Sequence, residues 1–194
     1  MGMPPDPSHQ RVSISPEHLR VERFVETRKV ESFDCGNSDL NDFLCTEEVS
    51  EYEAEGLGRT YLVYYQGDLV GYFTVTNDSL RVEYLKTVKS FSKFAEKSLE
   101  ALPALKIGRL AVAREHQRKG FGRLIIKYIA GMAVQLGAST GIRLLVLQAK
   151  PESIDFYEKK CGFELTRETK RERGRRNRTM FLDLYAIADV AHRR

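Results

Sequence analysis

The sequence predicts a fold of the α/β or α+β class, in which helices cover the faces of a mixed central sheet. Runs of β-branched and aromatic residues alternate along the chain with segments whose apolar residues repeat at helical spacing. One late run, residues 142–149, is almost continuously apolar, which is typical of a strand with both faces covered. The 194 residues, of which 42% are hydrophobic and 30% charged, are enough for one globular domain with its own core.

The first elements expected are a strand, a helix and a hairpin. The strand begins near Val21. Residues 33–52 then predict a turn followed by one helix, with Asn37 or Ser38 as its N-cap. Two β-rich runs joined by a glycine turn predict a hairpin over residues 60–75.

The second half continues the alternation of helices and strands. Residues 81–104 predict a helical stretch that Pro103 stops, and a strand follows at 105–113. The remaining elements are expected as a long amphipathic helix from Phe121 with Gly137 as its C′ residue, a strand at 142–149, a helix at 151–162 and a strand at 179–186.

The two ends and the hydropathy indicate a single soluble domain. The proline-rich start predicts a disordered leader at residues 1–16, which leaves one domain at 17–194. No apolar run approaches the roughly 20 residues needed to cross a bilayer, and the start has no signal-peptide pattern. We therefore expect a cytoplasmic protein without membrane contact.

The cysteines and histidines predict neither a disulfide framework nor a metal site. The three cysteines are widely spaced without a C-x-x-C pair, and the four histidines lack ligand spacing. We read the cysteines as small buried hydrophobic residues and expect no metal. The residues concerned are Cys35, Cys45, Cys161, His9, His18, His116 and His192.

Positive charge is concentrated in one short segment. Residues 170–178 hold six cations and one glutamate, whereas the rest of the chain is close to neutral. Such a run is commonly a solvated loop, and the alternative is a surface that contacts phosphates. The arginines of this segment that we consider for such contacts are Arg173, Arg175, Arg176 and Arg178.

The stretch QRKGFG, residues 117–122, lies between a predicted strand and a predicted helix. A helix begins with several N–H groups that lack partners, and its dipole favours an anion there. Glycines let a phosphate approach the backbone, although an ordinary capped turn explains the same pattern. Two other phosphate-binding motifs do not match: Ile125 replaces the third glycine of the dinucleotide fingerprint, and Lys119 precedes Gly120 rather than following it.

Two longer segments, 105–133 and 144–165, resemble the GNAT superfamily of N-acetyltransferases. The family's (Gln/Arg)-x-x-Gly-x-(Gly/Ala) signature corresponds to residues 117–122. Its aromatic-Tyr-x-x-x-Gly-Phe element corresponds, with one extra spacer residue, to residues 156–163. The similarity covers about residues 21–184 and implies the GNAT fold, with a central sheet of about six to seven strands.

The resemblance also implies an active site. In this family the amides of the turn hold the pyrophosphate of acetyl-CoA, the strand before it pairs with the pantetheine arm, and the tyrosine, here Tyr157, is the general acid. The acetyl-CoA-binding residues that the resemblance implies are Leu110, Ala111, Val112, Gln117, Arg118, Lys119, Gly120, Phe121, Gly122, Arg123 and Phe156.

A narrower similarity connects residues 33–44, 108–112 and 148–157 with the GNAT toxins of toxin–antitoxin pairs, which acetylate the amino group of aminoacyl-tRNA. Many GNAT enzymes carry Asn six residues before the tyrosine, where this chain has Pro151. The toxin group also tends to lack that Asn, so this departure favours the toxin group. The similarity implies aminoacyl-tRNA and a small antitoxin as partners, and a homodimer as a possible assembly. The basic segment 170–178 would then contact tRNA.

Acetyl transfer to an amine requires a neutral amine, an N–H donor for the oxyanion and a proton for the leaving thiolate. The reference pKa of a tyrosine, near 10, is above that of a thiol, near 8.5, so donation from Tyr157 is uphill unless nearby cations stabilise the phenolate. No carboxylate lies on residues 105–112. This favours an α-amine, with a pKa near 7.8, over a lysine near 10.4. Glu115, Glu152 or Glu158 acting through water is the alternative.

Two other functions remain open at this point. One is the same acetyl-CoA-dependent reaction on a small amine or a protein N-terminus. The other is a catalytically silent regulator that binds acyl-CoA.

Overall fold

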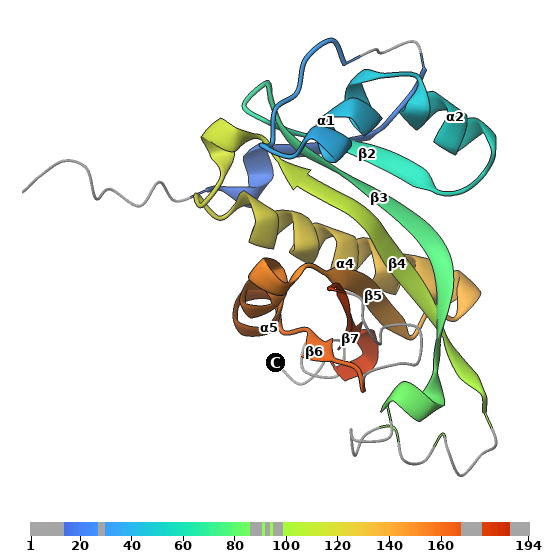
Figure 1. Ribbon diagram of the computed structural model, residues 1–194. Coiled ribbons are helices and arrows are strands. Elements are labelled where there is room, and N and C mark those ends of the chain that lie inside the picture. Colours follow the sequence, from blue (N-terminus) through green and yellow to red (C-terminus); the bar gives the residue numbers. More distant parts are fainter. Residues whose placement is uncertain are drawn as a thin grey trace, which may run out of the picture.

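The computed structural model describes residues 14–26, 30–85, 91, 94, 99–167 and 176–186. Within these ranges, seven strands form one sheet in the order β1-β2-β3-β4-β5-β7-β6. All neighbouring strands are antiparallel except β4 and β5, which are parallel. Helices cover both faces of the sheet (Figure 1). The predicted mixed sheet of six to seven strands with flanking helices is confirmed.

The bounds of the elements are as follows. The strands are β1 (Leu19–Arg23), β2 (Arg59–Tyr65), β3 (Asp68–Arg81), β4 (Ala101–Val112), β5 (Leu144–Ala149), β6 (Glu164–Leu165) and β7 (Arg178–Asp183). The α-helices are α1 (Ser38–Cys45), α2 (Glu48–Ala54), α4 (Phe121–Thr140) and α5 (Ile154–Cys161). Short 3-10 helices are η2 (Pro16–His18), η3 (Val82–Leu85), η5 (Arg114–His116) and η6 (Pro151–Ser153).

The predicted single helix after the first turn is two helices. Asn37 caps α1, as expected, by accepting a hydrogen bond from the Leu40 amide at 3.2 Å. The helix then stops because Thr46 adopts an extended conformation, and its hydroxyl accepts from the Glu48 amide at 3.3 Å. A threonine that satisfies the next helix start competes with continuation of the first helix.

The central hairpin strands are longer than predicted. The helical stretch expected in 81–104 is limited, among the described residues, to η3 and isolated helical positions, and β4 already begins at Ala101. Pro103 does not stop a helix but lies inside β4, opposite Ser79. Its missing N–H costs no bond to β5, because that pairing begins only at Ala104.

Two predicted element ends are also corrected. Helix α4 continues past Gly137 to Thr140, and Gly141, with φ 79°, is the left-handed C-cap. Gly137 has a packing role instead, since a Cβ there would lie 3.0 Å from the Ile142 carbonyl oxygen. Strand β7 ends at Asp183, whose carboxylate accepts from the Tyr185 amide at 3.0 Å and turns the chain.

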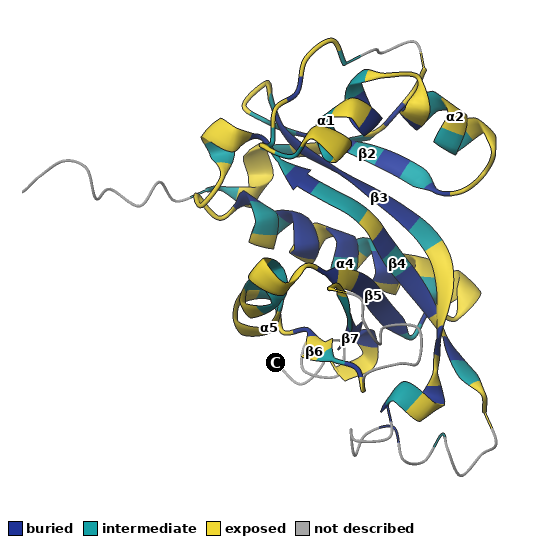
Figure 2. Cartoon of the chain, in the orientation of Figure 1, coloured by how far each residue is buried: buried dark blue, intermediate teal, exposed yellow. Residues whose placement is uncertain are grey.

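Three apolar clusters fill the fold. The main cluster lies between the sheet and α4, and includes Phe73, Ile125 and Leu145. A second cluster lies under α1 and contains Phe43 and Tyr72, and a third contains residues of η3, β4, β5 and β7. Figure 2 shows the buried stripe of α4 against the sheet. The three cysteines are free and only partly buried, rather than buried as predicted.

Residues 1–13 of the expected leader lie outside the described residues, and Ile14 packs against the main cluster. Among the described helices, none combines the length and the apolar character needed to cross a membrane.

Candidate active site

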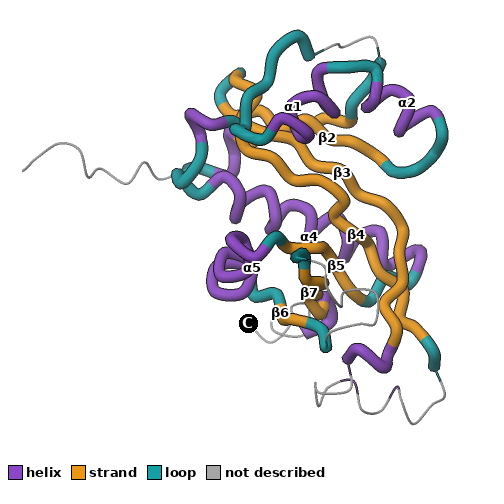
Figure 3. The backbone as a smooth tube through the Cα atoms, in the orientation of Figure 1, coloured by secondary structure: helices purple, strands orange, loops and turns teal. Residues whose placement is uncertain are grey.

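Strands β4 and β5 pair over only four residues each, and they can be followed in Figure 3. Residues 104–107 pair with 144–147, whereas 109–112 pair with β3 alone among the described strands. On the side of β5, this last stretch of β4 therefore presents N–H and C=O groups to which an extended ligand can pair. Leu110, Ala111 and Val112, the predicted donor-binding strand residues, lie in this stretch.

A β-bulge interrupts β4 where the two strands part. Arg109 pairs with Thr74 and Ile107 pairs with Val75, so Gly108 is the extra residue. A Cβ on Gly108 would lie 2.9 Å from Thr74 Oγ1, a buried hydroxyl without a hydrogen-bond partner among the described residues. Bulges reorient backbone groups and occur often beside active sites. The sequence analysis missed this bulge, although a lone glycine inside a strand is its usual signal.

The 117–122 turn has the backbone of an anion site. Arg118 and Gly120 both have positive φ, 59° and 105°. Helix α4 begins directly after Gly120 without a side-chain cap, and the first turn holds no acidic residue. Among the described residues, no group accepts a hydrogen bond from the first three amides of α4. Arg118, Lys119 and Arg123 are exposed around them, so the turn fits a diphosphate.

Helix α5 lies against this turn. A Cβ on Gly122 would lie 3.2 Å from Phe156 Cζ, so a side chain at this position would require the Phe156 ring to shift by a few tenths of an ångström. Phe121, in contrast, is buried, and its ring packs against Tyr65 with the ring centroids 5.1 Å apart. Ala111 is buried in the second cluster. The side chains of Phe121 and Ala111 are therefore not available to a ligand.

Tyr157 lies on α5 beside the predicted donor-binding residue Phe156. Its ring is edge-on to Phe156 and to Phe163, with centroid distances of 5.1 and 5.8 Å. Burial, with a smaller contribution from Cys161, raises the pKa of Tyr157 to about 12. The phenol is therefore protonated throughout the neutral range. No cation is among the causes of this shift, so the stabilisation of the phenolate that would ease proton donation is not found among the described residues.

The Gln117 side chain is held within the protein. Its Nε2 donates to the Cys35 carbonyl at 2.7 Å and to the Val112 carbonyl at 3.0 Å. The carbonyl of Cys35 belongs to the 33–37 loop, which precedes α1. The signature glutamine thus connects the turn to a distant part of the sequence.

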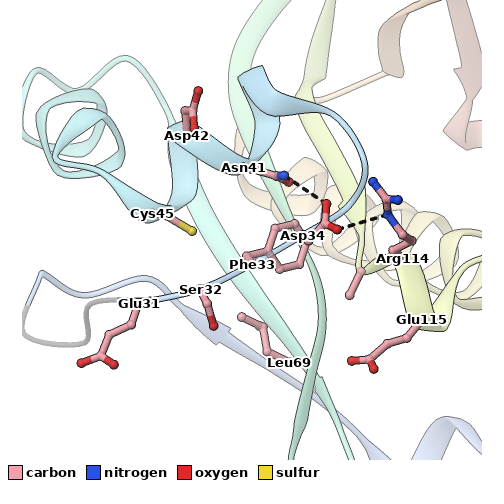
Figure 4. Close-up of a pocket in the computed structure, with 11 residues that line it drawn as sticks. Glu31, Ser32, Phe33, Asp34, Asn41, Asp42, Cys45, Leu69, Arg114 and Glu115 are labelled. Atoms are coloured by element: carbon pink, nitrogen blue, oxygen red, sulfur yellow. Dashed lines mark hydrogen bonds and ion pairs between the residues drawn. The ribbon is translucent and has the colours of Figure 1, made fainter.

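A cavity of about 770 Å³ lies beside the same loop (Figure 4). Its walls come from the 33–37 loop and the residues before it, from α1, and from residues 113–115 after β4. Four carboxylates and one arginine line it: Glu31, Asp34, Asp42, Glu115 and Arg114. Such a lining suits a cationic group better than an RNA phosphate.

The face of the sheet under α1 and α2 carries a charged cluster at the bulge. The Arg109 guanidinium lies 3.6 Å from the Phe43 ring centroid and 5.1 Å from that of Tyr52. Arg109 Nη2 also contacts Glu48 Oε1 at 3.1 Å. Because Glu48 comes from α2, sequence reasoning restricted to β4 missed a carboxylate beside this strand.

The other candidate bases have separate locations. Glu115 lies 3.5 Å from His116 Nε2 and lines the cavity beside the 33–37 loop. Glu152 is exposed in η6, and Glu158 is exposed on α5. Among the described residues, no group of three or more His, Cys, Asp or Glu is arranged to hold a metal ion.

The four arginines considered for tRNA contacts differ in what the structure says of them. Arg173 and Arg175 lie outside the described residues. Arg176 is exposed. Arg178 is half-buried at the start of β7, and its Nη2 donates to the Thr166 carbonyl at 3.5 Å. Only Arg176 is thus described as an exposed cation.

A second cavity, of about 720 Å³, lies between α4 and α5. Its floor is apolar and includes Ile126 and Leu182. The charged residues that line it are Arg123, Lys127, Lys159, Lys160 and Glu158. Since Arg123 also flanks the 117–122 turn, positive charge continues from the turn along this groove.

The comparisons with known proteins agree with this geometry. The model of the acetyltransferase (GNAT) family matches residues 22–163. The chain belongs to the GNAT acetyltransferase family. The predicted resemblance and the predicted enzyme class are therefore confirmed.

A curated relative from Mycobacterium tuberculosis (strain ATCC 25618 / H37Rv) is a tRNA-acetylating toxin. It is 22% identical over 144 residues, which cover 74% of this chain and 83% of the relative.

Solved toxin structures share the fold. AtaT complexed with acetyl-methionyl-tRNAfMet is 22% identical, with a TM-score of 0.73, over 89% of this chain and 98% of that chain. A tyrosine-to-phenylalanine mutant of KacT is 20% identical, with a TM-score of 0.74, over 89% and 99%. AtaTR bound with AcCoA is 22% identical, with a TM-score of 0.68, over 90% and 98%.

Proposed function

We propose that this chain moves the acetyl group of acetyl-CoA to the α-amine of aminoacyl-tRNA in the cytoplasm, and so blocks translation. One observation carries this proposal: the similarity to a tRNA-acetylating toxin extends over 83% of that relative's length. The same relation suggests a small antitoxin protein as a partner. A homodimer stays a prediction.

The residues on the splayed side of β4 fit the donor. The free amides at the start of α4, with Arg118, Lys119 and Arg123 around them, would bind the diphosphate. The predicted stretch Leu110, Ala111 and Val112 would pair with the pantetheine arm on the edge that β5 leaves open, through the backbone groups that do not face β3 and other than the Val112 carbonyl, which accepts from Gln117. Phe156, which lies against Gly122, would contact the same ligand from α5.

The chemistry needs little from side chains. Acetyl-CoA supplies the activated thioester. An amide of β4 near the Gly108 bulge would donate to the thioester carbonyl oxygen, a kind of contact worth about 3 kcal/mol in a transition state. Tyr157, whose pKa burial raises to about 12, would donate a hydrogen bond to the departing sulfur. It would pass its proton to the thiolate as the proton lost by the amine replaces it, because transfer from so weak an acid to the thiolate of a thiol with a pKa near 8.5 is uphill on its own. Proton loss from an α-amine near pKa 7.8 needs no strong base.

The acid-lined cavity favours a second candidate acceptor. Its carboxylates, among them Asp34 and Asp42, would attract a small cationic amine or a protein N-terminus and repel RNA phosphates. Contacts to tRNA would then have to come from the basic residues, such as Arg176. A small-amine acetyltransferase is therefore the alternative that the structure itself supports.

Acceptor competition tests the proposal. Purified protein is mixed with acetyl-CoA and either bulk aminoacyl-tRNA, deacylated tRNA or a panel of small amines and peptide N-termini, and thiol release is followed. We expect release with aminoacyl-tRNA and none with deacylated tRNA. Release with only the small amines would replace the acceptor, and no release with any acceptor despite acetyl-CoA binding would indicate a silent regulator. Tyr157→Phe is the inactive reference, and Tyr128→Phe, an exposed tyrosine on α4, is its matched control.

A further inference from the structure

The 117–122 turn has a conformation that needs support from outside itself. Arg118 is a non-glycine residue with φ 59°, a region that side chains rarely adopt. Gly120, two residues later, has φ 105°. Because the first amides of α4 point away from any described acceptor, the turn has few bonds of its own to hold this shape.

Gln117 supplies a bond between this turn and two other segments. Both N–H groups of its side-chain amide have acceptors, Cys35 O at 2.7 Å and Val112 O at 3.0 Å. An amide nitrogen has only two hydrogens, so Gln117 has no N–H left to donate to a bound phosphate. The Gln117 side chain therefore positions the turn and does not bind the phosphate itself.

Arg114, at the other end of η5, makes a second connection to the same loop. Its amide donates to the Asp34 carbonyl at 2.8 Å, and its Nε contacts Asp34 Oδ2 at 3.1 Å. Gly36, with φ 81°, passes under this side chain, and a Cβ there would lie 3.3 Å from Arg114 Nη2. The 33–37 loop thus contacts the chain at both ends of η5, through Arg114 and through Gln117.

The loop is itself held by hydrogen bonds to Asp34 and to Asn41 of α1. Asp34 Oδ1 accepts from the Gly36 amide at 2.7 Å and from Asn41 Nδ2 at 3.2 Å, as Figure 4 shows in part. Asn41 Oδ1 in turn accepts from the Cys35 amide at 2.9 Å. The hydrogen bond from the Gly36 amide is the main cause that lowers the pKa of Asp34. The carboxylate is ionised at neutral pH and can accept these hydrogen bonds.

We propose that Gln117 and Asp34 are positioning residues that connect the 33–37 loop to the 117–122 turn and hold its amides in the shape that binds the donor's diphosphate. This inference rests on the proposed function, since it takes acetyl-CoA as the ligand of the turn. It gives the FDCGN motif of the first loop a role in donor binding, although that motif is 80 residues from the turn.

The test uses two donors that differ only beyond the pantetheine arm. S-acetyl-pantetheine carries the same thioester as acetyl-CoA but no diphosphate. For Gln117→Leu we expect KM for acetyl-CoA to rise about tenfold with kcat little changed, while kcat/KM for S-acetyl-pantetheine stays within twofold of the wild type. Gln117→Arg keeps side-chain donors and should recover most of the loss.

Two variants control the experiment. Gln135→Leu makes the same change at an exposed position of α4, where the side chain lines the second cavity and not the 117–122 turn, and should behave as the wild type. Asp34→Ala should reproduce the donor-specific loss, whereas Asp39→Ala, an exposed aspartate in the first turn of α1, should not.

The outcomes distinguish a failure of the proposed function from a failure of the positioning role. If the wild type binds no acetyl-CoA, the proposed function fails. If the wild type binds it and Gln117→Leu binds it equally well, only the positioning role is wrong. A loss of equal size for both donors, or one that Gln117→Arg leaves unchanged, also overturns the positioning role.

Discussion

The two faces of the sheet around β4 are built in different ways. On the side of α4, the proposed donor site consists of backbone groups without partners among the described residues, at the open edge of β4 and at the start of α4, with exposed cations around them. On the side of α1 and α2, the proposed acceptor side consists of side chains from distant segments, among them Arg109, Glu48 and the carboxylates of the cavity. A backbone site suits one constant ligand, whereas a side-chain site can be altered residue by residue to suit different acceptors.

The largest effect should come from the side chain that lies nearest the proposed chemistry. Tyr157→Phe should lower kcat by about 10²- to 10⁴-fold, as expected for loss of a general acid, with KM for acetyl-CoA unchanged. Because the pKa of Tyr157 is about 12, the wild-type rate should show no alkaline decline up to pH 10. Thiol-release assays across pH check both expectations. A decline between pH 8 and 9 would assign the acid role to another group.

A side chain at Gly120 should break the backbone site selectively. At φ 105°, Gly120→Val introduces strain on the order of 1–3 kcal/mol, and moving the turn to relieve it would weaken acetyl-CoA binding by about 5- to 150-fold. Titration calorimetry measures the affinity.

Gly131→Ala, in the middle of the same helix, is the matched control. A Cβ there meets no atom within 4 Å, so the substitution should raise the free energy of unfolding by about 0.5–1 kcal/mol and leave affinity intact. Equal losses of affinity in both variants would mean that the left-handed turn is not what binds the donor.

A change at Arg109 should affect the opposite face. Arg109→Ala removes the contact with the Phe43 ring and the ion pair with Glu48, at a cost of about 1 kcal/mol. We expect KM for the acceptor to rise several-fold with KM for acetyl-CoA unchanged, in two-substrate kinetics. Arg109→Lys keeps the charge, and its KM for the acceptor should lie between those of the wild type and Arg109→Ala. An equal rise in both KM values would show that the faces are not independent.

The smallest effect concerns long-range charge. Replacing Arg173, Arg175 and Arg176 with Gln should lower the slope of log affinity for tRNA against log salt by about 2, at roughly 0.7 for each phosphate contact to a single strand. Filter binding at several salt concentrations measures this slope. Arg178 is left out because its bond to the Thr166 carbonyl gives it a structural role. Arg81→Gln, at an exposed ion pair far along β3, should leave the slope unchanged.

The sequence predicts those features of the structure that depend only on neighbouring residues. The glycines of the 117–122 turn, the hairpin turn at Gly67 and the left-handed Gly162 each act within a few residues, so their neighbours predict them. The end of α4 was misplaced because Gly137 and Gly141 give the same local signal, and only packing against Ile142 separates them.

The parts that sequence reasoning missed depend on contacts across the sheet. Gln117 has its acceptors on β4 and 82 residues away in the 33–37 loop, and no spacing rule connects these. Arg109 meets Glu48 from 61 residues away. The start of β4 was missed because Pro103 was interpreted as the stop of a helix, whereas a proline is tolerated inside this strand because the pairing with β5 begins only at Ala104.

The short pairing of β4 with β5 has a mechanical consequence. Among the described strands, β1–β4 pair with β5–β7 through residues 104–107 and 144–147, so the two halves of the sheet share a short seam. A ligand that pairs with the open edge of β4 would extend this seam and hold the two halves of the sheet together more firmly. Amide hydrogens at the seam, such as those of Ile107 and Leu147, should then exchange more slowly when the edge is occupied, and the molecule should resist unfolding as one body.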